Sequence, residues 1–183
     1  ITKVSVMDIV NEKIESIYMI VPEVAEDIRD AGRRTVAAFG VKGRLVHFEY
    51  FRLSHDQEGL GKAGEIVGLE VNMRPSGGFT PDMINYAGSV DIFRLWADMV
   101  LHDRIFLQED RRTFFCVFVG RQDVRAYAHD HEEVLRDWGH RIMYTDRMPE
   151  ALSGAMGNII YLAKCINQDE VDAFIDYTCK RLA

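Results

Sequence analysis

The stretch at positions 68–78, GLEVNMRPSGG, constrains the fold of this chain more than any other. Side chains alternate between the two faces of a β-strand, so Glu70, Asn72 and Arg74 share one face and the apolar residues between them share the other. A carboxylate, an amide and a guanidinium side by side, followed by a Pro-Ser-Gly-Gly turn, suit a site that holds a hard cation and an oxyanion together. We therefore expect a core surface on one face of this strand and chemistry on the other.

A partner strand precedes this stretch. Leu45–Leu53, LVHFEYFRL, has the aromatic and β-branched content of a strand and places Glu49 among aromatic side chains. The polar, glycine-rich segment Ser54–Gly64 is typical of a connection between antiparallel strands, of which the second is Glu65–Arg74. If the two strands pair, Glu49 and Glu70 lie on one face, close enough to share a divalent cation. Without a cation, two neighbouring buried carboxylates repel each other.

The remaining patterns predict an α+β chain with a mostly antiparallel sheet flanked by helices. We expect a boundary near residues 101–110, which divides residues 1–103 from a small α+β extension at 104–183. Whether both parts share one sheet stays open. The expected helices are Val24–Phe39, Thr80–Tyr86, Asp91–Val100, Asp130–Gly139 and Asp169–Leu182. The expected strands are Val4–Val10, Thr113–Val119, Arg141–Thr145 and Asn158–Ile166, whereas Asn11–Val21 is ambiguous between helix and loop.

The amino-acid composition of the chain excludes several classes of binding partner. The chain has 183 residues, of which 48% are hydrophobic, which is enough for a real core. The net charge of -7 argues against a nucleic-acid-binding surface, and no apolar run approaches the roughly 20 residues of a membrane helix. Cys116, Cys165 and Cys179 contain no CxxC pair, so neither a disulfide framework nor a thiolate zinc site is predicted. We expect a cytoplasmic protein with no nucleic-acid or membrane partner, and a homodimer stays open.

The order of these features resembles a known family. A helix, a strand with Glu49 among aromatic residues, a hairpin, and a strand ending E-x-N-x-R (Glu70, Asn72 and Arg74) before two glycines are similar to the C-terminal lobe of ATP-grasp enzymes, over roughly residues 24–99. The resemblance implies an ATP-dependent ligase that activates a carboxylate as an acyl phosphate for attack by an amine, most like carboxylate-amine and amino-acid ligases. Biotin-carboxylase-like and carbamoyl-phosphate-synthase-like enzymes remain alternatives, as does a noncatalytic ATP-grasp-like interaction domain.

The resemblance also implies roles and partners. Glu49, Glu70 and Asn72 would bind the Mg²⁺ or Mn²⁺ ions that bridge the phosphates of ATP, and Arg74 would be the catalytic contact to the transferred phosphoryl group. Magnesium prefers oxygen ligands, and an arginine fork suits an oxyanion, so the residue types fit these roles independently. The chain enters strand-like sequence directly after Ile1, which predicts a fragment. ATP and a small carboxylate substrate would then be bound through missing N-terminal and lid domains, and the fragment alone would be inactive.

Each candidate also has an ordinary structural explanation. Glu70 and Arg74 can form a same-face surface ion pair, worth about 0.5 kcal/mol. The His-Asp-His run at 129–131 is more typical of a capped, solvated turn than of a metal site. A substrate role stays open for His47, because it lies beside Glu49. Otherwise we expect a packed or edge histidine at His47, a solvated basic pair at Arg111 and Arg112, and an inert core thiol at Cys116.

Overall fold

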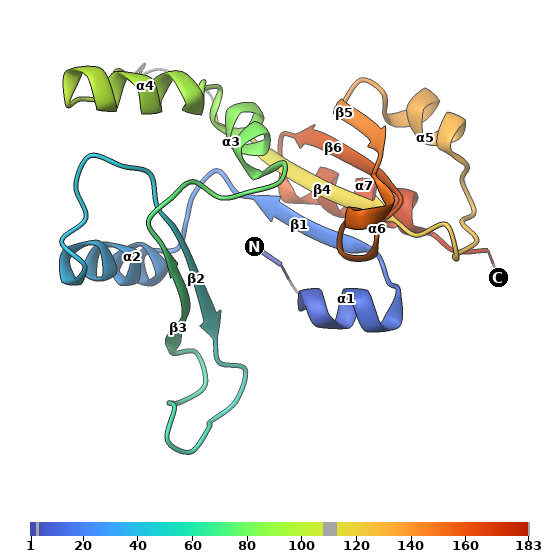
Figure 1. The fold of residues 1–183 in the computed structure, drawn as a ribbon. Helices are drawn as coiled ribbons and strands as arrows, with labels where there is room; N and C mark the ends of the chain where they lie inside the picture. Colours follow the sequence, from blue (N-terminus) through green and yellow to red (C-terminus); the bar gives the residue numbers. More distant parts are fainter. Residues whose placement is uncertain (3, 108–112, 183) are drawn as a thin grey trace. The chain divides into compact units, whose positions relative to one another are not determined.

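A computed structural model describes residues 1–2, 4–107 and 113–182 of the chain (Figure 1). The chain forms two compact units, which are treated separately below. Unit 1 consists of Ile1–Pro22, Asp82–Val90 and Asp110–Ala183, and unit 2 consists of Glu23–Pro81 and Asp91–Glu109. The pair Arg111 and Arg112 lies outside the described residues, and the predicted division between residues 103 and 104 stays a prediction.

Unit 1 is built on a four-stranded antiparallel sheet with the order β1-β4-β6-β5. Its strands are β1 (Ser16–Ile20), β4 (Phe115–Arg121), β5 (Ile142–Arg147) and β6 (Ile159–Cys165). Its helices are α1 (Val6–Glu12), α5 (His131–Trp138), α6 (Glu150–Met156), α7 (Gln168–Cys179) and, from Asp82 onward, α3 (Thr80–Gly88). The strand nearest the start of the chain therefore pairs with a strand from its second half.

The core of unit 1 lies where α5 and α7 pack on the sheet. Alternate residues of β4 and β6, such as Val119 and Tyr161, meet Val134 of α5 and Phe174 of α7, and all four are fully buried. On the other face of the two central strands, Cys116, Phe118, Ile160 and Leu162 are fully buried as well, and Phe118 stacks on Tyr18 of β1. Burial on both faces explains why these strands read as continuous apolar runs.

Side-chain caps explain where α5 and α7 begin. Asp130 accepts from the backbone N–H of Glu133, whose carboxylate accepts from the N–H of Asp130, which forms a capping box at the start of α5. Gly139 ends that helix, as predicted. Asn167 caps α7, which starts one residue before the predicted Asp169. The sequence patterns did not predict α6, which is a short helix without a side-chain cap.

The predicted strand at Val4–Val10 is wrong, because Val6–Glu12 forms α1. The Ser5 hydroxyl accepts from the backbone N–H of Asp8 at 3.1 Å and donates to its carboxylate at 2.8 Å. This cap favours a helix over the strand that the apolar spacing indicated. The ambiguous segment that follows contains β1, whose hydrogen-bonding partner β4 is remote in sequence and therefore invisible to a local pattern.

Unit 2 contains the two-stranded antiparallel sheet of β2 (His47–Arg52) and β3 (Ile66–Asn72), with helices α2 (Glu26–Ala38) and α4 (Ile92–His102). The predicted helices and strands of this unit are confirmed within a few residues. Helix α2 lies against the hairpin, since the Thr35 and Tyr50 hydroxyls are 2.8 Å apart and Arg52 pairs with Asp27 at 2.7 Å. No helix among the described residues is long and apolar enough to span a membrane.

Candidate functional site

The pairing of β2 with β3 brings the predicted acidic residues together. Glu49 is directly opposite Glu70, and His47 is directly opposite Asn72. Residues two apart in a strand point to the same side, so these four side chains share one face of the hairpin. Opposed residues of an antiparallel pair have Cβ atoms about 4.5–5.5 Å apart. The predicted strand pairing is confirmed, and the roles of the two carboxylates stay a prediction.

A β-bulge lies next to this face. The register shifts after Glu49, so that Tyr50 pairs with Gly68 and Leu69 has no partner of its own. Bulges increase the local twist and often re-aim side chains beside functional sites. The sequence analysis missed the bulge, although the isolated Gly68 inside a strand was a signal for one.

The two carboxylates have no strong cation beside them. Within the described residues, no lysine or arginine forms an ion pair with Glu49 or Glu70. The basic group that pairs with Glu49 is His47, whose Nε2 lies 3.5 Å from Glu49 Oε1. Like charges directly opposite each other destabilise a sheet. Glu70 is exposed and the side chain of Glu49 is 42% exposed, so the pair is not the buried one that was expected. Water screens the repulsion between the two carboxylates, and a cation would reduce it further.

Arg74 lies just beyond the strand that was predicted to include it. β3 ends at Asn72, because its partner β2 begins at the opposed His47 and offers no residue further on. The guanidinium of Arg74 is exposed and donates to the carbonyl of Pro75 at 2.9 Å. The alternative explanation, a surface ion pair between Glu70 and Arg74, is not formed among the described residues.

Two atoms of this face are buried without a partner. They are Nδ1 of His47 and Nδ2 of Asn72. An unsatisfied buried polar group costs about 1–3 kcal/mol, so such groups are few in native structures. His47 is half-buried at the start of β2, as an edge histidine would be.

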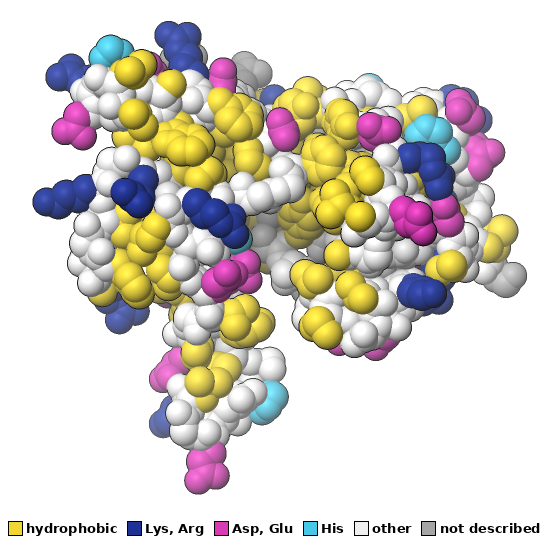
Figure 2. All heavy atoms as spheres, viewed as in Figure 1, with side chains coloured by type: hydrophobic (Ala, Val, Ile, Leu, Met, Phe, Trp, Pro, Cys, Tyr) yellow, Lys and Arg dark blue, Asp and Glu magenta, His cyan; other side chains and the backbone are white. Residues whose placement is uncertain are grey.

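The apolar residues of β3 do not form the predicted core surface. Leu69 is 56% exposed and Val71 is 37% exposed, whereas Met73 is partly buried. The prediction is wrong for the first two, because the sheet has only two strands and no described element of unit 2 buries these side chains. Figure 2 shows hydrophobic side chains at the surface of the hairpin.

The oxygen atoms of this face fit a hard divalent cation. Glu49, Glu70 and Asn72 offer two carboxylates and one carboxamide oxygen, which Mg²⁺ and Mn²⁺ accept as ligands. In the described part of the chain, no three His, Cys, Asp or Glu side chains are grouped to hold a metal. Two carboxylates and an amide leave the other ligand positions of such a cation to water or to phosphate oxygens, as is usual for Mg²⁺ in proteins.

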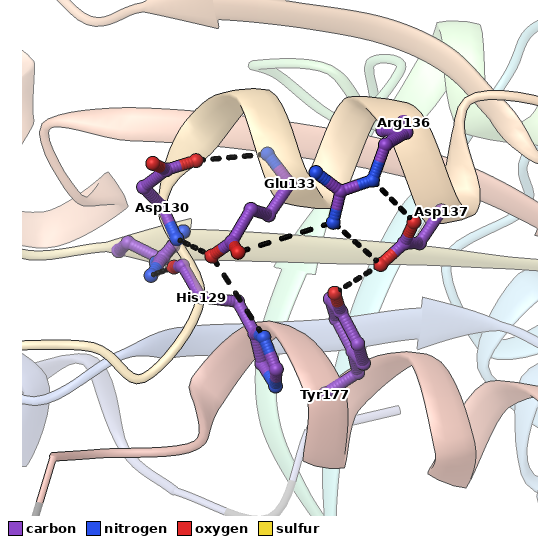
Figure 3. Close-up of polar contacts among 7 residues, drawn as sticks. His129, Asp130, Glu133, Arg136, Asp137 and Tyr177 are labelled. Carbon is purple, nitrogen blue, oxygen red and sulfur yellow. Dashed lines mark hydrogen bonds and ion pairs between the residues drawn. The ribbon is translucent and has the colours of Figure 1, made fainter.

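The His-Asp-His run is a capped turn, as predicted (Figure 3). Asp130 and Glu133 form the capping box of α5, and the ring of His129 stacks on Tyr177 with centroids 3.8 Å apart. The Tyr177 hydroxyl donates to Asp137 at 2.5 Å. Hydrogen bonds from Arg136 and, to a smaller extent, from Tyr177 lower the pKa of the Asp137 carboxyl. These contacts join α5 to α7.

Cys116 is an inert core residue, as predicted. It is fully buried, and burial raises the pKa of its thiol to about 12. Cys165 is also fully buried, with a pKa raised by burial to about 12. Cys116, Cys165 and Cys179 are all free thiols.

One buried cation escaped the sequence analysis. Arg121, at the end of β4, is only 4% exposed and lies over the ring of Tyr127, 3.9 Å from its centroid. It donates to the carbonyl of His129 at 2.5 Å, and no carboxylate pairs with it among the described residues. The position of Arg121 directly after an apolar run was the sequence signal that could have indicated its burial.

Comparisons with known proteins were made by sequence and by structure. No protein-family model matches the chain, and no curated protein matches it by sequence. In structure it is similar to an L-amino acid ligase from Bacillus licheniformis, with a TM-score of 0.59 and 16% identity over 86% of this chain and 41% of the ligase chain. The chain therefore spans less than half the length of that ligase. The likeness confirms the predicted α+β fold class, because the chain has the fold of part of that ligase.

Proposed function

We propose that the chain is part of an ATP-dependent ligase that activates a small carboxylate as an acyl phosphate for attack by an amine. The observation that carries the proposal is the position of Glu49 directly opposite Glu70, with Asn72 on the same face and no lysine or arginine paired with either carboxylate among the described residues. The structural likeness to an amino acid ligase supports the same reaction class.

In this proposal the three residues hold Mg²⁺ or Mn²⁺ together with ATP. Glu49 and Glu70 offer carboxylate oxygens, and Asn72 offers its carboxamide oxygen. The bound cation supplies neutralisation of the phosphate charge. Phosphoryl transfer depends mainly on positioning and charge stabilisation, so the site requires no nucleophilic side chain from the protein.

Arg74 is the proposed catalytic residue. Its guanidinium carries five N–H donors, of which one donates to the carbonyl of Pro75, the one bond that Arg74 makes among the described residues. A planar fork of donors suits the oxygens of a phosphoryl group or carboxylate. Because Arg74 lies past the end of β3 and is exposed, it is free to turn toward such an oxyanion.

The surfaces that bind the nucleotide base and the substrates are proposed to lie in further domains. This chain corresponds to 41% of the ligase that it resembles. We therefore expect the 183-residue chain by itself to bind Mg-ATP weakly and to release no ADP.

The test measures carboxylate-dependent ADP release by the longest form of the protein that contains these residues. Glu70→Gln keeps the size of the side chain and removes its charge, so we expect ADP release to fall by about 100-fold or more. Glu58→Gln, in the exposed connection between β2 and β3, is the matched control and should retain full activity.

Three outcomes would contradict the proposed ligase. Full activity of Glu70→Gln would remove the carboxylate pair from the mechanism. Activity that requires bicarbonate would favour biotin-carboxylase-like or carbamoyl-phosphate-synthase-like chemistry. No ADP release with any carboxylate tested would favour a noncatalytic lobe that serves interaction.

A further inference from the structure

Two orphaned polar atoms lie at the open end of the β2–β3 hairpin. Nδ1 of His47 and Nδ2 of Asn72 are both buried and unpartnered, and their residues are directly opposed across the two strands. Buried polar atoms are nearly always hydrogen-bonded. Two unpartnered atoms on opposed residues therefore point to a hydrogen bond between them, which forms when the two side chains turn toward each other.

The two atoms are complementary in one tautomer of the imidazole. The amide nitrogen of Asn72 only donates, whereas a neutral imidazole has one protonated nitrogen and one acceptor. Nε2 of His47 lies 3.5 Å from a carboxylate oxygen of Glu49, which only accepts. The proton therefore belongs on Nε2, and Nδ1 is left as the acceptor that Asn72 requires.

We infer that His47 is a positioning residue for the cation site, with its Nε2–H directed to Glu49 and its Nδ1 accepting from the Asn72 carboxamide. This inference rests on the proposed function, since it concerns the same ligands. Once the Asn72 nitrogen is bound to His47, Oδ1 is the carboxamide atom that remains for a ligand, and oxygen is what a hard cation requires. One imidazole thus orients two of the three proposed ligands.

The opposite tautomer would have different consequences. With the proton on Nδ1, His47 and Asn72 would present donors to each other, and Nε2 would present a lone pair to Glu49. Asn72 could then satisfy its amide only by turning its oxygen toward His47, away from a cation. The tautomer of His47 therefore distinguishes a positioning role from simple packing.

The first experiment reads this tautomer without any metal. Two-bond ¹H–¹⁵N correlation spectra of the histidine-labelled chain are recorded where imidazoles are neutral, and the His47 signals are assigned by their loss in His47→Gln. We expect the Nε2–H tautomer in the wild type. Asn72→Asp replaces the donor with an acceptor and should shift the population to the Nδ1–H tautomer. An Nδ1–H tautomer in the wild type, or no response to Asn72→Asp, would overturn the inference.

The second experiment titrates the same chain with Mn²⁺ alone and follows paramagnetic broadening of the Glu49, Glu70 and Asn72 amides. His47→Leu should weaken the affinity by about 10–100-fold, as is usual when a partner of a metal ligand is removed. His47→Gln, whose carboxamide has an NH₂ group that donates and a carbonyl oxygen that accepts, should restore most of the affinity. His55→Leu, in the connecting loop, is the matched control and should bind as the wild type does.

The two experiments separate the inference from the proposed function. Equal affinity of His47→Leu and wild type, or no restoration by His47→Gln, would overturn the positioning role while the cation site survives. Absence of localised broadening in the wild type would instead overturn the cation site, and the positioning role with it. Cross-strand contacts between Phe48 and Val71, which pair in the hairpin, verify that each variant keeps the fold.

Discussion

The two sheets of this chain are both antiparallel, but their side chains are buried to very different extents. In unit 1, Val117 and Phe118 of the central strand β4 are 0% exposed, so both faces of that sheet are covered. In unit 2, Phe51 and Leu69 of the β2–β3 hairpin are more than half exposed. The difference shows that unit 1 carries the stability of a complete core, whereas the hairpin presents an open face on which two opposed carboxylates remain available.

Tryptophan fluorescence can follow the two units separately. The chain has two tryptophans, of which Trp138 lies in unit 1 and Trp96 in unit 2. Replacing one with phenylalanine leaves the other as the reporter of its own unit in urea unfolding. The comparison can then be tested with matched substitutions, one in each unit.

The largest difference is expected for phenylalanine truncation. Phe174→Ala removes a fully buried ring that packs edge-on against Trp138 at 5.3 Å, so the free energy of unfolding of unit 1 should fall by about 3–5 kcal/mol. Phe51→Ala removes a ring that is 53% exposed, and unit 2 should lose less than about 1 kcal/mol. Similar losses in both units would contradict the contrast in burial.

A smaller difference is expected for glycine substitution within strands. A Cβ at Gly120 in β4 would lie 1.8 Å from the backbone oxygen of Met156, so Gly120→Ala should destabilise unit 1 by about 1–3 kcal/mol or more. A Cβ at Gly68 in β3 would meet no atom within 4 Å, so Gly68→Ala should leave unit 2 unchanged or stabilise it by up to about 1 kcal/mol. A tolerated Gly120→Ala in urea unfolding would show that this strand is less tightly covered.

The smallest difference is expected when a glutamate is neutralised, because the change should destabilise unit 1 and should leave unit 2 as stable or slightly more stable. Glu15 accepts from the Tyr127 hydroxyl at 2.8 Å and from Arg181 at 2.9 Å. Burial raises the pKa of Glu15, but hydrogen bonds from the backbone, Tyr127 and Arg181 outweigh it, so the net pKa is lowered. Glu15→Gln should therefore destabilise unit 1 by about 1 kcal/mol at neutral pH.

The pH dependence of that loss follows from the sign of the shift. A lowered pKa gives stability that is present above the ordinary carboxyl pKa and is lost as the pH falls through the folded-state value. Unfolding of unit 1 followed at Trp138 should thus show a weaker acid dependence in Glu15→Gln than in the wild type. Glu70→Gln should instead leave unit 2 as stable or slightly more stable, because it removes a like charge opposite Glu49. A destabilised Glu70→Gln would mean that Glu70 has a structural partner.

Local signals predicted much of the fold. The Asp130 cap and Gly139 predicted α5 to within a residue, and the polar, glycine-rich segment after Leu53 predicted the β2–β3 hairpin. Segments whose structure depends on remote partners were harder to predict. β1 acquires its conformation from pairing with β4, and the cap from Ser5 decided that α1 is a helix.

The residues of the candidate site were predicted more completely than their arrangement in space. Alternation placed Glu70 and Asn72 on one face, and the hairpin brought Glu49 opposite Glu70. The bulge after Glu49 and the end of β3 before Arg74 depend on the pairing register, which residue spacing alone does not fix. The orphaned atoms of His47 and Asn72 depend on burial and require coordinates.

The most direct test of a cation site on the hairpin is the effect of Mg²⁺ on the unfolding of the two units, each followed in the variant that keeps only its own tryptophan. A cation that binds only the folded state stabilises the unit that binds it, by an amount that grows with its concentration relative to its dissociation constant. We predict that Mg²⁺ raises the urea midpoint of unit 2, followed at Trp96, and leaves unit 1, followed at Trp138, unchanged, and that Glu70→Gln abolishes the increase. Equal shifts in both units, or an unchanged midpoint of unit 2 in the wild type, would contradict the carboxylate pair as a magnesium site.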